Sequence, residues 1–187
     1  MKAIIGSIAL VCISTCCNAS TACDDLWLAR NAIFDLHGYC FGSTLGKSIF
    51  DNKDCNTVNP KLAPTVEKRI QQLWQRAKLL SCDTDQGRTT ISVYNIEQRK
   101  RLIHQPIASE TESACIGYKG LPFYLYNAPN EGALKIGLIE QGDDIGWFHD
   151  DENQWSFMTV LNKENGSTPI SGWSREDAIP NCEASAG

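Results

Sequence analysis

The fold is decided first by residues 26–38, which have the sequence Leu26-Trp27-Leu28-Ala29-Arg30-Asn31-Ala32-Ile33-Phe34-Asp35-Leu36-His37-Gly38. Four apolar residues recur there at the spacing of one helix face, namely Leu26, Ala29, Ile33 and Leu36. The preceding pair Asp24-Asp25 is expected to cap the start of this helix, and Gly38 can adopt the left-handed conformation that ends one. The stretch therefore predicts an amphipathic helix in the N-terminal half of the chain.

Two further helices are expected after this one. A short helical turn fits residues Thr44 to Phe50, and a longer helix fits Pro64 to Leu80, because proline is favoured in the first turn. The longer segment carries one apolar stripe, made of Val66, Ile70, Leu73, Trp74, Ala77 and Leu80. The three segments can pack as a helical hairpin.

The chain changes character after Cys82. We expect a turn at 83–88, a strand at 89–94, a short polar helix at about 97–104 and a connecting segment at 107–115. Five short β-type runs then follow between turn residues, at Phe123–Tyr126, Leu134–Ile139, Ile145–His149, Trp155–Leu161 and Ile170–Ser174. The last of the intervening turns is expected at Asn162–Gly166. This pattern predicts a small β-barrel, and hence an α+β fold of two modules.

The N-terminus has the layout of a secretory signal peptide. Lys2 precedes an apolar run from Ala3 to Ile13, and small residues follow as far as Ala22. We prefer cleavage after Ala22, with Ala19 as a second possibility and a lipoprotein anchored at Cys23 as the alternative. The apolar run is shorter than the roughly 20 residues of a membrane-spanning helix, so we expect no transmembrane segment. The predicted location is the periplasm or the outside of the cell.

The cysteines support this location. Of the nine cysteines, six remain after removal of residues 1–22, namely Cys23, Cys40, Cys55, Cys82, Cys115 and Cys182. An even number in an oxidising compartment indicates disulfides, and no Cys-x-x-Cys pair is present among them to suggest a metal site. Six cysteines allow 15 connectivities.

One motif is more specific than these patterns. Residues 30–41 resemble the YARHG domain, a small extracytoplasmic bacterial module whose motif runs Arg-Asn-x-Ile-Tyr-Ala-Arg-His-Gly-Tyr-x-Phe. The matching positions are Arg30, Asn31, Ile33, His37, Gly38, Tyr39 and Phe41. Phe34, Asp35 and Leu36 stand where the motif has Tyr, Ala and Arg.

A second stretch is similar to bacterial SH3-like domains. It runs from residues 125–129 through Gly142 and Trp155 to Gly172-Trp173-Ser174. Together the two resemblances point to a proteobacterial family of exported proteins with no established activity. They imply a signal peptide at 1–22, a YARHG-like helical domain at 23–82, a connector at 83–114 and an SH3-like β-barrel at 115–187.

The resemblance to an SH3-like barrel also implies a disulfide pairing. The first and last strands of such a barrel bring the domain ends together, which favours Cys115 with Cys182. By the same logic Cys23 pairs with Cys82 at the ends of the helical domain, and Cys40 is left for Cys55.

Several residues suggest chemistry. His37 could act as an acid or base, but a histidine at a helix end also satisfies free carbonyls, and we favour that structural role. Arg30 and Asn31 are expected to pair with Asp24, Asp35 or backbone carbonyls. A Cys-His nucleophile would need a free thiolate, which an even set of cysteines does not provide. No catalytic residue, metal ligand or cofactor is therefore assigned.

Charged segments outside the motif are interpreted as ordinary surface. Asp83-x-Asp85 with Gly87 resembles part of a calcium loop, but the other ligands are missing, so we expect a turn. Residues 149–152, of sequence His-Asp-Asp-Glu, are likewise expected to form a solvated hairpin turn. The basic cluster at residues 99–101 could contact an acidic polymer or a lipid headgroup, although a basic helix face needs no partner.

The aromatic residues of the β-rich part are the best candidates for recognition. The candidates are five residues, namely Tyr124, Tyr126, Trp147, Trp155 and Trp173. Trp173 is expected to fill the core. Because small SH3-like barrels bind ligands in aromatic grooves, we predict a groove with Tyr124, Tyr126 and Trp147 as members.

These observations favour an exported binding protein over an enzyme. The net charge of −5 becomes more negative when Lys2 is removed, which argues against nucleic-acid binding. We predict a non-enzymatic protein of the cell envelope that recognises peptidoglycan peptide or an envelope protein. An envelope enzyme inhibitor or immunity-type protein is the alternative, and a cysteine-dependent cell-wall hydrolase is third. Oligomeric state is left open.

Overall fold

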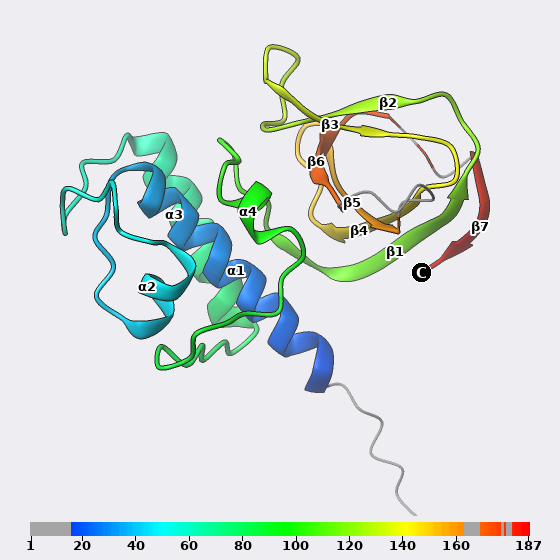
Figure 1. The fold of residues 1–187 in the computed structure, drawn as a ribbon. Coiled ribbons are helices and arrows are strands. Elements are labelled where there is room, and N and C mark those ends of the chain that lie inside the picture. Colours follow the sequence, from blue (N-terminus) through cyan, green and yellow to red (C-terminus); the bar gives the residue numbers. More distant parts are fainter. Residues whose placement is uncertain (1–15, 163–168, 177, 179–180) are drawn as a thin grey trace, which may run out of the picture.

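The computed structural model describes residues 16–162, 169–176, 178 and 181–187. A helical part and a β-rich part lie side by side (Figure 1). The helical part contains α1 (Cys16–Leu36), α2 (Thr44–Ile49) and α3 (Pro64–Leu79), and the short α4 (Ile96–Arg99) lies in the segment that leads to the β-rich part. No helix in the described ranges has both the length and the apolar character of a membrane span. The predicted signal peptide lies mostly outside the described residues.

The three predicted helices of the N-terminal part are confirmed, with one correction at the start of α1, whereas the helix predicted at about 97–104 is only the short α4. Gly38 has a φ of 75° at the end of α1, and Ser43 caps α2 by accepting the Gly46 amide at 3.0 Å. However, in the full-length chain α1 begins at Cys16 and not at the Asp24-Asp25 pair, so these two aspartates lie inside the helix. They are buried, and their role is in tertiary contacts rather than capping.

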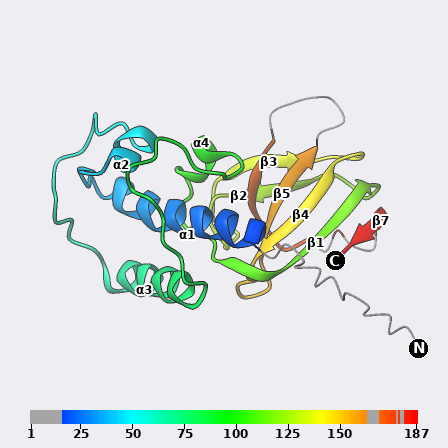
Figure 2. The same cartoon turned by 90° about the horizontal axis from the view of Figure 1, so that it is seen from below.

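Helix α1 is covered on two sides. One face packs against α3 through a cluster that includes Leu26, Ala29, Ile33 and Leu73. Another face meets the loop and α2 through Trp27, Leu28, Ala32, Phe41, Leu45 and Phe50. Figure 2 shows α1 running between α2 and α3 towards the strands. The first helix is therefore the central element of the helical part.

The three predicted disulfides are confirmed. Cys23 is bonded to Cys82 and Cys40 to Cys55, with Cα atoms 5.3 Å and 4.9 Å apart. Cys115 is bonded to Cys182 across two neighbouring strands, with a Cα separation of 5.3 Å. The first bond joins the middle of α1 to the segment after α3, and it ties these helices together.

The β-rich part is one antiparallel sheet of seven strands in the order β3-β2-β6-β5-β4-β1-β7. Its elements are β1 (Ala108–Tyr118), β2 (Phe123–Tyr126), β3 (Lys135–Ile139), β4 (Asp144–His149), β5 (Ser156–Asn162), β6 (Ser171–Ser174) and β7 (Cys182–Ala186). The sheet curls strongly, yet its edge strands β3 and β7 do not pair with each other (Figure 1). The prediction of a β-barrel is therefore wrong in that the sheet is not closed.

Two other sequence predictions need correction. Residues 107–115 were predicted to be a connecting segment, but most of them belong to β1, which pairs with both β4 and β7. Residues 89–94 were predicted to be a strand but are irregular. The turn predicted at 162–166 falls almost entirely outside the described residues.

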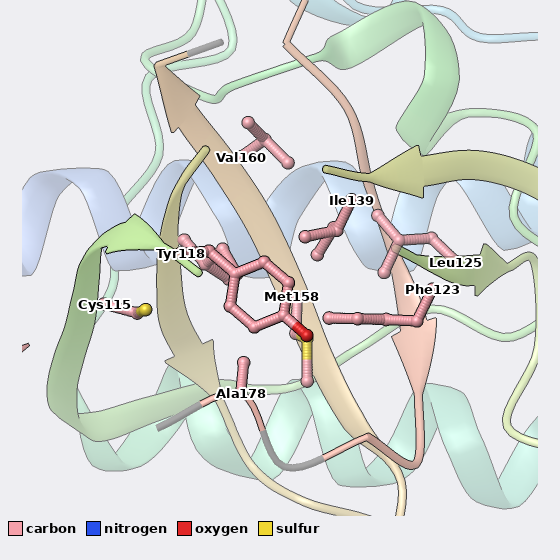
Figure 3. Close-up of a cluster of buried hydrophobic side chains, with 9 residues drawn as sticks. Cys115, Tyr118, Phe123, Leu125, Ile139, Met158, Val160 and Ala178 are labelled. Atoms are coloured by element: carbon pink, nitrogen blue, oxygen red, sulfur yellow. The ribbon is translucent and has the colours of Figure 1, made fainter. Parts of the chain in front are cut away.

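The inside of the curled sheet holds the main apolar core (Figure 3). It consists of Cys115, Tyr118, Phe123, Leu125, Ile139, Ile145, Met158, Val160 and Ala178. Because neighbouring side chains of a strand point to opposite faces, β5 also buries Phe157 on its other side. There Phe157 and Trp173 pack with Leu102 of the segment between α4 and β1, and the Trp173 indole donates to the His104 carbonyl at 2.9 Å. Trp173 is thus buried as expected, but against the segment between α4 and β1.

Buried charges join the two parts. At their centre Asp25 of α1 accepts two hydrogen bonds from Arg99, of 2.6 and 3.0 Å, and lies 3.2 Å from Nε2 of His149 on β4. We call Asp25, Arg99 and His149 the junction cluster. The Arg99 guanidinium also lies over the Phe157 ring at 5.2 Å. The residues of this cluster are far apart in the sequence, and only the fold brings them together.

The segment 149–152 is not the solvated turn that was predicted. His149 is buried, Asp150 is paired with Arg76 of α3 at 2.6 Å, and Glu152 is paired with Arg69 and with His104. This acidic hairpin tip docks on the basic side of α3.

Candidate functional site

The motif segment, residues 30–41, is largely structural. His37 Nδ1 donates to the Ile33 carbonyl at 2.7 Å, which satisfies a free carbonyl at the helix end. The Asn31 amide donates to the Trp27 carbonyl at 2.7 Å, as expected for a backbone partner. Tyr39 and Phe41 meet edge to face, with ring centroids 5.0 Å apart. These contacts hold the end of α1 against the loop that follows.

The same segment lines a groove of about 380 Å³ on the surface of the helical part. We call it the motif groove. Its lining residues come from α1, the following loop and α3, and they are Arg30, Asn31, Phe34, Tyr39, Ile70, Gln71 and Trp74. Trp74 is 54% exposed, and the rings of Phe34 and Tyr39 pack at 5.6 Å. The groove is therefore an aromatic surface open to solvent.

Arg30 is the unusual member of the motif groove. It is half-buried, and its guanidinium forms no hydrogen bond or ion pair with any residue in the described part of the chain. Burial lowers the pKa of this guanidinium, and no neighbouring carboxylate opposes that effect. Asp24, one of its expected partners, is paired with Arg88 instead. Arg30 is thus a partly desolvated positive charge to which the described part of the chain supplies no counter-charge.

The predicted aromatic groove of the β-rich part takes a different form. Tyr124 is 46% exposed on β2, with the Lys135 ammonium 3.7 Å from its ring centre. Tyr126 packs beside Trp155 in the cluster that contains Leu102, whereas Trp147 of β4 packs against the main core inside the curled sheet. Strands β6 and β5 lie between β2 and β4 in the sheet. The three predicted binding residues are therefore not brought together.

Trp147 instead lines a polar groove of about 570 Å³ beside the acidic hairpin tip. Its other walls include Ser113, Gln154, Arg175 and Glu176. Arg175 is already paired there, since it donates to Glu131 at 2.6 Å and to Gln154 at 3.0 Å. This groove presents no unpaired arginine.

The junction cluster has shifted pKa values that follow from its burial. Burial by itself would raise the pKa of Asp25, but the Arg99 charge and the contact with His149 hold it well below the usual range. Burial lowers the pKa of His149, against the opposing effect of Asp25. At neutral pH the Nε2–H of a neutral His149 therefore donates to an ionised Asp25. These groups link the two parts through buried hydrogen bonds between α1, α4 and β4.

The remaining predicted sites have ordinary roles. The Asp85 carboxylate accepts the Gly87 amide at 2.8 Å, as in a simple turn. The basic cluster at 99–101 does not form one face, because Arg99 is buried and Lys100 pairs with Glu97 at 2.9 Å. Within the described residues, no group of His, Cys, Asp or Glu side chains is arranged to hold a metal ion.

Sequence reasoning missed the groove although it identified the motif. Trp74 was assigned to the apolar stripe of α3, and half of its surface turned out to be exposed. The available signal was the position of Trp74 directly after Leu73. Successive helix residues are about 100° apart, so the two side chains cannot both face the same neighbour.

Comparison with known families divides the chain into the same helical and β-rich parts. The model described as "YARHG domain" matches residues 13–76, which confirms the resemblance of the helical part. Neither the curated proteins nor the solved structures contain a match. The model described as "Domain of unknown function (DUF4453)" matches residues 81–187, which is more than half of the chain. The chain therefore belongs to the DUF4453 family and carries a YARHG domain ahead of the DUF4453 region.

Proposed function

We propose that this chain is an exported, non-enzymatic binding protein of the cell envelope, and that it recognises cell-wall peptide or an envelope protein through the motif groove. The observation that carries this proposal is Arg30, which lines a groove with aromatic walls and has no partner among the residues that the structure describes. A desolvated charge without a partner costs free energy, and binding sites are places where such a cost is retained.

The location in the envelope has separate support. The three disulfides and the YARHG domain are consistent with an extracellular or periplasmic protein. Disulfides persist in oxidising compartments and are rare in the cytosol. The signal peptide and its cleavage after Ala22 are part of the proposal, as is the relationship of the sheet to bacterial SH3-like domains.

Binding is favoured over catalysis by how the candidate groups are used. All six cysteines from Cys23 to Cys182 are in disulfides, so none of the six offers the thiolate that a cysteine hydrolase needs. His37 is bonded to the Ile33 carbonyl, and His149 is buried against Asp25. The open aromatic groove suits recognition better than it suits any of these reactions.

The test is binding by the full exported chain to isolated peptidoglycan and to an array of envelope-protein peptides. Trp74→Ala should weaken binding at least about tenfold, because exposed aromatic residues at the centre of a binding site dominate its energetics. Leu79→Ala is the matched control, since Leu79 is 75% exposed on the same helix and does not line the groove. No binding to either target at moderate salt, or equal loss in both variants, would refute the proposal.

A further inference from the structure

We infer that the motif groove binds the free carboxylate at the C-terminal end of a protein segment, with Arg30 as the residue that recognises it. The inference rests on the proposed function, and it specifies which chemical group of the ligand enters the groove and where that group is held.

The first step is the contrast between Arg30 and four other arginines near the helices whose side chains are likewise buried or partly buried. Each of four others is paired with a carboxylate, in the pairs Arg69–Glu152, Arg76–Asp150, Arg88–Asp24 and Arg99–Asp25. Arg30 is half-buried as well, yet no described residue supplies its counter-charge. Among the described residues, each of these five arginines has a carboxylate partner except Arg30, which lines the motif groove.

The second step is the chemistry of the missing partner. A guanidinium presents its N–H groups in a planar fork that matches a carboxylate, and such charge-assisted pairs are stronger than neutral hydrogen bonds. A partly desolvated guanidinium gains more from an anion than a solvated one, because less water has to be removed on binding. The ligand group that fits Arg30 is therefore a carboxylate.

The third step is the wall beside Arg30. Phe34, Tyr39 and the exposed Trp74 form an apolar surface in the groove that Arg30 also lines, and Ile70 adds to it. A ligand must then carry its carboxylate close to an apolar or aromatic side chain. The C-terminal residue of a protein combines the two on one α-carbon when that residue is large and apolar.

The size of the groove favours the end of a chain over a longer segment. A volume of about 380 Å³ lies at the lower end of the range for small-ligand sites, enough for one or two residues. A peptide that ends in alanine would leave most of the aromatic wall uncovered. We therefore assign the occupant to a protein C-terminus with a large apolar last residue.

The experiment uses the full exported chain and three short probes. These are acetyl-Ala-Ala-Phe as the free acid, the same peptide as its C-terminal amide, and acetyl-Ala-Ala-Ala as the free acid. Isothermal titration measures affinity, and the NMR signal of the Trp74 indole reports whether the groove is occupied. We expect the phenylalanyl acid to bind at least about tenfold tighter than either other probe, because one charged pair and one buried ring are each worth about that factor.

Variants connect the effect to Arg30. Arg30→Gln should remove the preference for acid over amide, while its melting curve shows that the protein remains folded. Lys78→Gln is the matched control, because the Lys78 ammonium lies 5.6 Å from the Trp74 ring centre and is a neighbouring cation outside the groove lining. The control should keep the preference of the wild-type protein.

The outcomes separate this inference from the proposed function. Equal affinity for acid and amide, or an unchanged preference in Arg30→Gln, would overturn the role of the carboxylate while leaving the groove as a binding site. Equal affinity for the alanyl acid would overturn the protein C-terminus and favour cell-wall peptide. A Trp74 signal that responds to no probe would overturn the inference even if the protein sediments with peptidoglycan.

Discussion

Arg30 and Arg99 are both arginines of limited exposure, but their energetics differ because Arg99 has a carboxylate partner and Arg30 has none among the described residues. Arg99 is held by two hydrogen bonds to Asp25, whereas burial of Arg30 is not offset by any described residue. Breaking a buried pair is costly, but removing an unpaired charge is not. The two residues therefore respond to substitution in opposite directions.

We expect Arg30→Met to raise the free energy of unfolding by about 0.5 to 1 kcal/mol, because it removes a desolvated charge and keeps the apolar stem. Chemical denaturation at constant pH measures this change. Arg30→Lys, which retains the charge, should show no such gain. Destabilisation by more than about 1 kcal/mol in Arg30→Met would mean that the guanidinium has a structural partner.

His37, unlike Arg30, has a partner, because its ring donates a hydrogen bond to a carbonyl at the end of α1. Its removal is therefore expected to destabilise the protein. His37→Ala should lower the free energy of unfolding by about 0.3 to 1 kcal/mol, or up to about 2 where partly buried, since it leaves the Ile33 carbonyl without this donor. Ligand binding below the melting temperature should survive. A stable His37→Ala protein that no longer binds would show that His37 has a functional role.

Gly38→Ala provides the comparison for His37. Gly38 has a φ of 75°, and a Cβ atom there would come within 2.8 Å of the Asn56 side chain. We expect a loss of about 1 kcal/mol or more, independent of any ligand. Similar melting shifts in both variants, with binding intact, would support a scaffold role for this part of the motif.

Among the elements, α1 contacts both the rest of the helical part and the β-rich part. It packs against α3, contacts the loop before α2 and carries both buried aspartates towards the connecting segment and β4. Asp24 pairs with Arg88 and accepts the Ser92 amide, while Asp25 pairs with Arg99 and His149. Two adjacent residues of one helix thus position two different segments of the connector.

The two aspartates give a matched pair of substitutions. Asp25→Asn should cost about 3 to 5 kcal/mol, because it leaves the buried Arg99 without a counter-charge. Asp24→Asn should cost less, about 1 to 2 kcal/mol, because the Arg88 side chain is 37% exposed and can be solvated by water. Urea unfolding of both variants measures the difference. A larger cost for Asp24→Asn would contradict this ranking.

In the whole molecule, the junction cluster makes the contact between the helical and β-rich parts sensitive to pH. His149 is faced by Asp25 from α1, by Arg99 from α4 and by the adjacent Asp150. The pKa of His149 is lowered in the folded protein, so the unfolded chain binds a proton first as the pH falls. Stability from the neutral His149 is present above the ordinary histidine pKa, near 6.5, and is lost below it.

We therefore expect the melting temperature to fall as the pH is lowered from about 7 to 5. His149→Gln should reduce this dependence, although its stability at pH 7 will be lower because the imidazole contacts with Asp25 and Phe157 are lost. Asp25 also has a lowered pKa, but its contribution is lost only below the ordinary aspartate range, near pH 4. An unchanged pH dependence in His149→Gln would exclude His149 as its cause.

The sequence alone determined the elements whose physical signal is local. The helices Thr44–Ile49 and Pro64–Leu79 and the strand Phe123–Tyr126 follow from apolar periodicity, a proline at a helix start and β-branched or aromatic runs. The end of the first helix follows from Gly38, since left-handed backbone favours glycine. The Cys115–Cys182 pairing followed from the resemblance to an SH3-like barrel, which implies that the domain ends are close, and it holds because β1 and β7 pair directly.

Only the tertiary structure decided the roles that depend on distant residues. Asp25 and His149 are 124 positions apart, so neither a cap signal nor a turn signal could reveal their contact. The open sheet, the docking of Glu152 on Arg69 and the strand β1 likewise depend on which segments pack together. The motif groove belongs to this group, because it is lined by residues of α1, the following loop and α3, and because Arg30 is seen to lack a partner only once the carboxylates of the described residues have been placed.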